Sequence, residues 1–331
     1  MTDLVAIARG LFAPGKGILA ADESVATADK RLASFGIEGG PEMRRKDREL
    51  FLNAEGIEVY LTGVILYRET FEQKGSDRKL FSNSLADRGI LTGIKIDEGT
   101  EPLPGSPNEF ITNGLIGLPE RFAEFAKKRA AFAKWRAAIK IEGDKLPTSN
   151  AILENAKRLA TYAKQAQEAG LVPIIEPEVL LEGSHSRLRA KAVIEEVLGS
   201  VFVVLESQAV DRASVIIKTA MALSGSKTGK RDTPEEVAAD TLEALMTHVP
   251  RQIAGVVFLS GGQTPDQATD NLTAIMRLAK ERHAPWPLTF SYSRALQEEA
   301  LALWGGEEAN VPPAREAYLA RLKKLSAAVS I

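Results

Sequence analysis

Short runs of apolar residues recur along the chain and are separated by longer stretches with a helical period. Each run is 6 to 9 residues long and rich in valine and isoleucine, which is typical of buried strands. There are eight such runs, at residues 17–22, 62–67, 92–97, 135–142, 172–178, 214–220, 254–262 and 287–293. The pattern therefore predicts eight strands that alternate with helices.

The stretches between the runs carry helix-start signals. Thr233 and Thr264 are each followed by a proline and an acidic residue, which favours an N-cap with proline in the first turn. Ser149 precedes another helical pattern, which we expect to stop near Gly170. One face of that pattern carries the apolar residues Ile152, Ala156, Leu159 and Ala163.

This order of elements predicts an α/β fold, a single closed (β/α)8 TIM barrel formed by residues 1–331 as one domain. The length suits such a barrel, which takes about 250 residues and more with insertions. An open doubly wound sheet is the alternative, but it would require a glycine-rich dinucleotide turn after an early strand. Here the first strand ends in the sequence AADES, residues 20–24.

Composition narrows the classes of function. The net charge is −2, so no strongly basic surface is predicted and nucleic acid is not an expected partner. The N-terminus lacks a signal-peptide pattern and no apolar run approaches the roughly 18 residues of a membrane span, so we expect a soluble cytoplasmic protein. Cysteine is absent, and His185, His248 and His283 are far apart and expected at the surface or at helix ends. We therefore predict neither a metal site nor a cofactor.

Charged residues interrupt the predicted strands, although the strands of a parallel barrel are covered on both faces and should be apolar. A buried charge is costly unless it is paired, so these residues are either exposed strand ends, structural ion pairs or parts of a functional site. Five strands carry them near their ends, where active sites of this fold lie, and this favours function. The residues are Asp22, Lys95, Asp97, Lys134, Arg136, Lys140, Glu176, Glu178 and Lys218.

Lys218 ends the apolar run Val215–Ile217, and this position suits an amine nucleophile. Burial and neighbouring cations both favour the free amine, which condenses with a ketone or aldehyde to form a Schiff base. Nearby carboxylates can transfer the protons that the condensation requires. The remaining cations would then bind an anionic substrate.

The ends of the last two strands predict a phosphate site. The seventh strand ends in Ser260–Gly262 before the helix start at Thr264, and the eighth ends in Ser291–Arg294. Glycine lets backbone N–H groups approach an anion, and arginine adds a charged fork. In this fold the loops that follow strands seven and eight often bind phosphate.

Motifs along nearly the whole chain resemble those of class I fructose-1,6-bisphosphate aldolases, the metal-independent Schiff-base enzymes. The similar segments, in order, are residues 13–24, 63–70, 93–97, 132–141, 172–178, 258–263 and 288–297. GILAADES, AKWR, PIIEPE and LSGGQ are highly specific in combination. The resemblance implies reversible cleavage of fructose 1,6-bisphosphate to dihydroxyacetone phosphate and glyceraldehyde 3-phosphate, no cofactor, and a homotetramer.

The resemblance also implies roles for individual residues. Lys218 corresponds to the Schiff-base lysine, Glu176 to the acid and base that dehydrates the carbinolamine, and Asp22 to an aspartate that acts at the C4 hydroxyl. Lys134 is similar to a lysine that stabilises charge near the reacting carbons, and Glu178 to a supporting carboxylate. Residues similar to the C1-phosphate site are Ser260, Gly261, Ser293 and Arg294. Those similar to the C6-phosphate site are Ser24, Thr27, Lys95 and Arg136.

Three features depart from the family pattern. Thr219-Ala220 follows Lys218 where typical animal and plant members have Pro-Asn. Ser293 replaces the glycine of a Tyr-Gly-Arg motif, so the loop is expected to adjust if it requires a positive φ. Animal members end in a longer tail with a terminal tyrosine, whereas Tyr318 lies in a predicted helix at 314–328 and is expected to pack on the barrel. We therefore expect protonation at C3 by Glu176 or water.

Several alternatives stay open at this point. The chain could be another lysine Schiff-base aldolase that acts on a monophosphorylated sugar, a non-catalytic sugar-phosphate-binding barrel, or a metal-dependent aldolase, which the histidine count disfavours. The pattern does not decide whether Asp22 or Glu176 deprotonates the C4 hydroxyl. It also leaves open the preference between fructose 1,6-bisphosphate and fructose 1-phosphate, the oligomeric state and the direction of flux.

Overall fold

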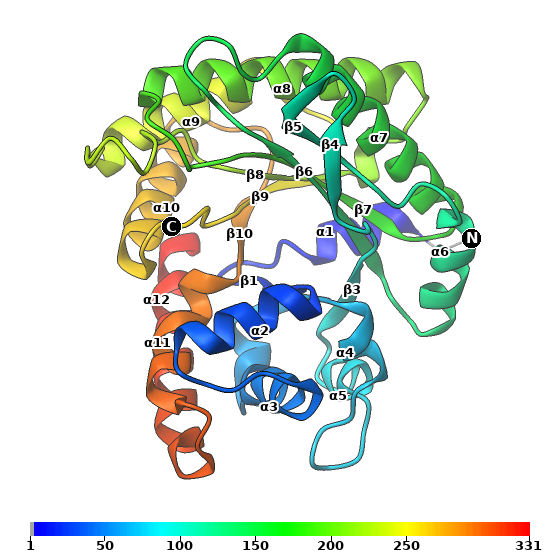
Figure 1. Cartoon of the computed structure of the whole chain (residues 1–331), viewed down its shortest axis with the longest axis vertical. Helices are drawn as coiled ribbons and strands as arrows, with labels where there is room; N and C mark the ends of the chain where they lie inside the picture. Colours follow the sequence, from blue (N-terminus) through cyan, green and yellow to red (C-terminus); the bar gives the residue numbers. More distant parts are fainter. Residues whose placement is uncertain (1–2) are drawn as a thin grey trace.

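The computed structural model describes residues 3–331, which form a closed barrel of eight parallel strands surrounded by helices (Figure 1). Around the barrel the strand order is β1-β10-β9-β8-β7-β6-β3-β2. The strands are β1 (Gly17–Ala21), β2 (Leu61–Leu66), β3 (Leu91–Lys95), β6 (Phe132–Ile139), β7 (Val172–Val179), β8 (Ile216–Thr219), β9 (Gly255–Phe258) and β10 (Leu288–Tyr292). Each overlaps one of the eight predicted runs, so the (β/α)8 prediction is confirmed.

Helices precede the first strand, connect the strands and follow the last one. They are α1 (Leu4–Gly10), α2 (Val25–Ser34), α3 (Pro41–Leu52), α4 (Arg68–Glu72), α5 (Phe81–Ala86), α6 (Leu118–Lys127), α7 (Ser149–Glu168), α8 (Arg187–Ser207), α9 (Pro234–His248), α10 (Pro265–Glu281), α11 (Arg294–Trp304) and α12 (Val311–Val329). Within residues 3–331 we find no helix long and apolar enough to cross a membrane.

The predicted helix starts agree with the structure at two positions and differ at a third. The Thr233 hydroxyl caps α9 and the Glu236 carboxylate accepts from the Thr233 backbone N–H, which completes a capping box. The Thr264 hydroxyl caps α10. The cap of α7 is Thr148 rather than Ser149, because the Thr148 hydroxyl accepts from the backbone N–H of the third helical residue, at 3.2 Å.

A hairpin that the sequence pattern did not predict follows β3. It pairs β4 (Thr100–Leu103) with β5 (Ser106–Thr112) in antiparallel fashion. Glu109 anchors the hairpin because its carboxylate accepts from the backbone N–H and the hydroxyl of Thr148, both at 2.7 Å. The hairpin is thereby attached to the start of α7.

Inward-pointing side chains, which occur at every second residue along each strand, form two levels inside the barrel. The lower level, which we call the apolar floor, consists of Ile18, Ala20, Ile65, Phe132, Val172, Ile174, Ile216 and Val257, packed with Ala8 and Leu11 from the N-terminal segment. Because side chains alternate along a strand, residues two positions further along point into the same interior. Asp22, Glu176 and Lys218 each lie two residues beyond a floor residue, so they form the upper level, at the carboxyl ends of the strands.

Gly93 on β3 makes room for the ring of Phe132, the largest residue of the apolar floor. A Cβ on Gly93 would lie 2.1 Å from the Phe132 ring, so only glycine fits at this position of β3. Phe132 is fully buried and fills the lower part of the barrel. The floor is therefore packed, and the hollow that remains opens at the upper end.

Candidate functional site

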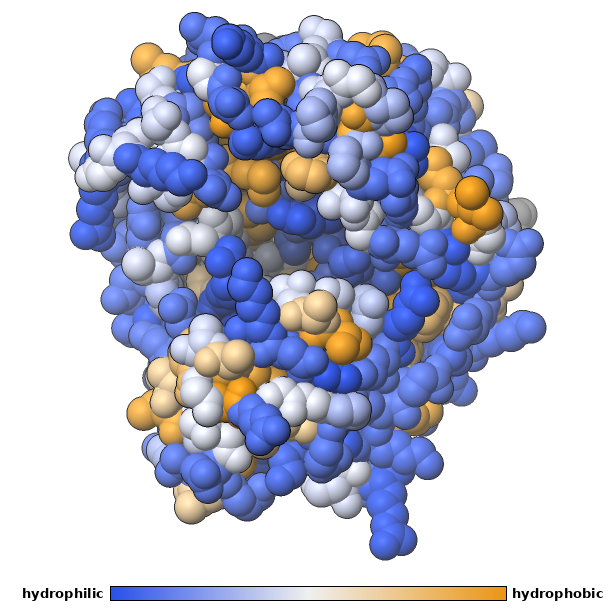
Figure 2. Space-filling view, viewed as in Figure 1, coloured by the Kyte–Doolittle hydropathy of each residue, from blue (hydrophilic) through white to orange (hydrophobic). Residues whose placement is uncertain are grey.

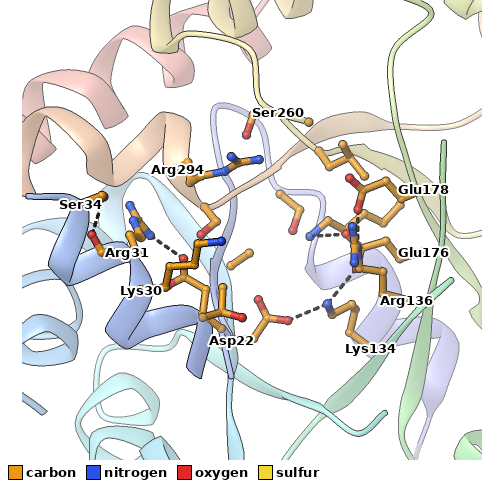
Figure 3. A pocket seen from close by; sticks show the side chains of 18 residues that line it. Asp22, Lys30, Arg31, Ser34, Lys134, Arg136, Glu176, Glu178, Ser260 and Arg294 are labelled. Carbon is orange, nitrogen blue, oxygen red and sulfur yellow. Dashed lines mark hydrogen bonds and ion pairs between the residues drawn. The ribbon is translucent and has the colours of Figure 1, made fainter. Parts of the chain in front are cut away.

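Four charged side chains, from β6, β7, β8 and the residue that follows β1, meet at the centre of the barrel mouth. Lys134 on β6 places its Nζ 2.7 Å from Oδ2 of Asp22 and 2.8 Å from Oε2 of Glu176. Lys218 on β8 places its Nζ 3.0 Å from Oε1 of Glu176. Glu176 therefore bridges two lysines. The close-up of the cavity shows Lys134 with its partners Asp22 and Glu176 (Figure 3). None of the four side chains is more than 9% exposed.

In this quartet of Asp22, Lys134, Glu176 and Lys218, mutual attraction keeps Asp22, Lys134 and Glu176 charged despite their burial. Burial alone would raise the pKa of Asp22, but the positive charges of Lys134 and Lys218 outweigh it and lower the pKa to about 2. Burial also opposes ionisation of Glu176, and the same two lysines nevertheless lower its pKa. Burial would lower the pKa of Lys134, but Asp22 and Glu176 raise it. Two carboxylates and an ammonium group thus stay ionised where water is largely excluded.

A second set of ion pairs surrounds the quartet. Arg136 donates to Glu178 through Nε, and Lys95 donates to Asp97. The Asp97 carboxylate also accepts from the backbone N–H of Arg136 at 3.3 Å, which joins β3 to β6. The Arg136 side chain is 37% exposed and the Lys95 side chain 15%, so both cations are accessible from the cavity.

Two cavities meet at the quartet. The first, of about 480 Å³, extends toward β9 and β10, and the second, of about 590 Å³, extends toward β2 and β3. Figure 2 shows a hollow near the centre of the viewed face, bordered mostly by hydrophilic residues. Both cavities include Asp22, Glu23, Thr27, Lys134 and Arg136.

All thirteen candidate residues from the sequence line one or both cavities. The first cavity contains Asp22, Thr27, Lys134, Arg136, Glu176, Glu178, Lys218, Ser260, Gly261, Ser293 and Arg294. The second contains Asp22, Ser24, Thr27, Lys95, Lys134 and Arg136. Ser260, Gly261, Ser293 and Arg294 line only the first cavity and Ser24 and Lys95 only the second, whereas Thr27 and Arg136 line both. Lys140 lines neither cavity; it lies beyond the end of β6 and donates to Glu142 at 2.8 Å.

The loops after β9 and β10 have the backbone conformation expected of an anion site. Gly261 and Gly262 adopt φ values of 58° and 91°, which other residues avoid. Ser293 precedes α11 with φ −112°, so serine fits here without the strain that a positive φ would cause. The replacement of the family's glycine is therefore tolerated locally. Arg294 begins α11 and points into the first cavity (Figure 3).

Helix α2 provides a part of the first cavity wall that was not predicted from the sequence. Lys30, Arg31 and Ser34 lie at helical spacing from Thr27 and line the cavity with it, opposite Glu176 and Glu178 (Figure 3). Arg31 donates to Glu23 at 2.9 Å and to Gln297 at 2.6 Å. Helical spacing could have predicted these three residues. Once Thr27 is assigned to the site, the positions three, four and seven residues later lie on the same face of the helix.

Two predictions outside the cavity have different outcomes. His185 was expected at the surface or at a helix end; it precedes α8 but is only 7% exposed, because Gly183 and Gly225 leave room for its ring. Burial, together with the charge of Arg189, lowers its pKa. The packing of Tyr318 is confirmed, since it is fully buried with its ring edge against Phe51 at a centroid distance of 5.0 Å.

The chain matches a known protein family and is similar to named proteins over almost its whole length. The family described as fructose-bisphosphate aldolase class-I matches residues 3–330. Cytosolic fructose-bisphosphate aldolase 4 of Arabidopsis thaliana is 45% identical over 326 residues, which cover 98% of this chain and 82% of that protein. Fructose-bisphosphate aldolase C of Rattus norvegicus is 44% identical over 96% of this chain and 87% of its own length.

A solved structure shares the fold over nearly the full length. The fructose-bisphosphate aldolase of Plasmodium falciparum, crystallised with TRAP and a small-molecule inhibitor, superimposes with a TM-score of 0.95. It is 39% identical in sequence, and the match covers 99% of this chain and 94% of that one.

Proposed function

Because the chain belongs to the class-I fructose-bisphosphate aldolase family, we propose that it reversibly cleaves fructose 1,6-bisphosphate to dihydroxyacetone phosphate and glyceraldehyde 3-phosphate through a Schiff base on Lys218. One observation carries the proposal: Glu176 contacts the amines of Lys218 and Lys134 at once, at 3.0 and 2.8 Å. A proton acceptor thus lies beside the nucleophile, and a fixed cation lies on the acceptor's other side.

The proposed reaction begins with transfer of a proton from the Lys218 ammonium group to Glu176. The free amine adds to the C2 ketone, and the protonated Glu176 returns a proton to the carbinolamine hydroxyl, which leaves as water. The resulting iminium ion draws electrons from the C3–C4 bond while Asp22 or Glu176 removes the proton of the C4 hydroxyl. Cleavage leaves an enamine on Lys218, and protonation at C3 followed by hydrolysis releases dihydroxyacetone phosphate.

Lys134 and Glu178 have supporting roles in this proposal. Lys134 keeps its positive charge between Asp22 and Glu176, where it stabilises negative charge that develops on the C4 oxygen. Glu178 holds Arg136 through an ion pair at the cavity wall. These side chains are already oriented by their partners, which lowers the cost of arranging them for the reaction.

The two phosphates occupy the two cavities in this proposal. The C1 phosphate binds in the first cavity, against the loop glycines after β9 and the arginine fork of α11: Ser260, Gly261, Ser293 and Arg294. The C6 phosphate binds in the second, at Ser24, Thr27, Lys95 and Arg136. The alternative, an aldolase for a monophosphorylated sugar, would leave Lys95 and Arg136 without a phosphate to bind, paired only with Asp97 and Glu178.

Borohydride trapping tests the covalent step. Reduction in the presence of dihydroxyacetone phosphate should inactivate the enzyme and attach the three-carbon unit to Lys218, which peptide mapping would locate. A Lys218→Met variant should take up no label under the same conditions. Labelling of Lys134 or Lys95, or labelling of the variant, would contradict the assignment.

Two further properties belong to the proposal. Two of the matching plant enzymes are named cytosolic, which supports a cytoplasmic location for this chain. The family resemblance supports a homotetramer, and light scattering coupled to size exclusion would test it against the mass of one chain, 35.8 kDa.

A further inference from the structure

One strand that borders the second cavity, β2, contributes no residue to the phosphate site proposed above. Ser24 and Thr27 follow β1, Lys95 ends β3, and Arg136 lies on β6. In the barrel β2 lies between β1 and β3, and its mouth therefore faces the same cavity. Tyr67 and Arg68 follow β2 directly and line the cavity together with the residues of the neighbouring strands.

Two other cations of the second cavity already have a carboxylate partner that is buried or partly buried. Lys95 is paired with Asp97, whose side chain is 3% exposed, and Arg136 is paired with Glu178, whose side chain is 13% exposed. The cavity wall has four basic and four acidic side chains, whereas that of the first cavity has six basic and four acidic ones. A phosphate dianion in the second cavity therefore needs a cation that can leave its carboxylate.

Arg68 meets this requirement. Its Nη2 lies 3.3 Å from Oε1 of Glu98, and the two side chains are 49% and 40% exposed, so the pair is solvated and weak. Glu98 has a second cationic neighbour, because its Oε2 lies 3.6 Å from Nη1 of Arg121. Arg68 can therefore leave Glu98 while Arg121 remains as the partner of that carboxylate.

We infer that Arg68 is a specificity-determining residue that exchanges Glu98 for the distal phosphate of the substrate. The planar guanidinium then forms a fork with two phosphate oxygens, a geometry that lysine does not reproduce. Fructose 1-phosphate has no group for this fork, so Arg68 favours the bisphosphate over the 1-phosphate. The inference rests on the proposed function and deepens it.

The test compares the two substrates in one variant. In Arg68→Gln, KM for fructose 1,6-bisphosphate should rise about tenfold, the loss typical of one charge-assisted hydrogen bond, while kcat falls less than twofold. KM for fructose 1-phosphate should change less than twofold. The matched control is Arg251→Gln, an exposed arginine before β9 at the opposite end of the barrel, which should leave both values unchanged. An equal rise for both substrates, or no rise for either, would overturn the inference.

Two further variants test the exchange of partners. Glu98→Gln removes the competing carboxylate, so KM for the bisphosphate should fall about two- to threefold while that for the 1-phosphate stays constant. Arg68→Lys keeps the charge and loses the fork, and should lie between wild type and Arg68→Gln. An increase in the bisphosphate KM of Glu98→Gln would also overturn the inference. A wild-type protein that cleaves neither substrate and traps no label would instead contradict the proposed function.

Discussion

Glu176 forms ion pairs with two lysines at once, and the proposed chemistry requires Lys218 to give up its proton to this carboxylate. In Glu176→Gln the acceptor is lost, so kcat should fall at least about a hundredfold, the usual contribution of a general base. Borohydride labelling of Lys218 should slow in parallel. Glu142→Gln, which removes the solvated partner of Lys140, is the control and should retain wild-type kcat. Unchanged kcat in the first variant would exclude this role for Glu176.

The lowered pKa of Asp22 makes the free energy of unfolding depend on pH in the acid range. Its pKa is lowered from 3.8 to about 2 in the folded chain, so its contribution is complete above about pH 4 and is lost as pH falls toward 2. The shift corresponds to about 2 kcal/mol of unfolding free energy. In urea titrations between pH 5 and pH 2.5, Asp22→Asn should therefore show a shallower loss of stability than wild type. The exposed Asp144→Asn should follow the wild-type curve; identical curves for all three proteins would contradict the prediction.

The residues of the site were predictable to different degrees. Charges at strand ends identify Asp22, Glu176 and Lys218 because a barrel interior tolerates charge only at its mouth. Their pairing was not predictable, since Asp22 and Lys134 come from strands that are not neighbours and approach only when the barrel closes. The sequence likewise gave no indication that Glu98 lies between Arg68 and Arg121.

At the scale of elements, α9 begins directly after the loop that follows β8, and its capping box defines that start. Thr233→Ala removes the hydroxyl cap and should lower the free energy of unfolding by about 1 kcal/mol, measured by urea denaturation. Thr247→Ala, on the exposed side of the same helix, should cost less than about 0.5 kcal/mol. Equal effects of the two substitutions would mean that the cap contributes nothing beyond helix propensity.

Elements with strong local signals were predictable, and those held by tertiary contacts were not. The eight strands follow from runs of apolar residues, and α9 and α10 from Thr-Pro-acid starts. The hairpin of β4 and β5 has little apolar pattern, because Thr100, Glu101 and Pro102 are all exposed. Glu109 holds it to α7 through contacts between residues 39 positions apart, which no local pattern reveals.

At the scale of the whole molecule, the composition makes a prediction about metal dependence. The chain has no cysteine and only three widely separated histidines, so it lacks the usual ligands of a catalytic zinc. Activity should therefore survive prolonged incubation with EDTA. Loss of activity that zinc or cobalt restores would favour a metal-dependent reaction over the Schiff-base route.

The apolar floor also limits the route by which small molecules reach and leave Lys218. Because Phe132 and its neighbours close the lower end of the barrel, water, substrate and products share the opening at the mouth. In the proposed reaction, C–C cleavage leaves the aldehyde product in the second cavity and the enamine on Lys218, which lines the first cavity. We predict that the bound aldehyde crowds the shared mouth and slows the approach of solvent protons and of the water for hydrolysis to the enamine. Added glyceraldehyde 3-phosphate should accordingly slow deuterium exchange at C3 of bound dihydroxyacetone phosphate.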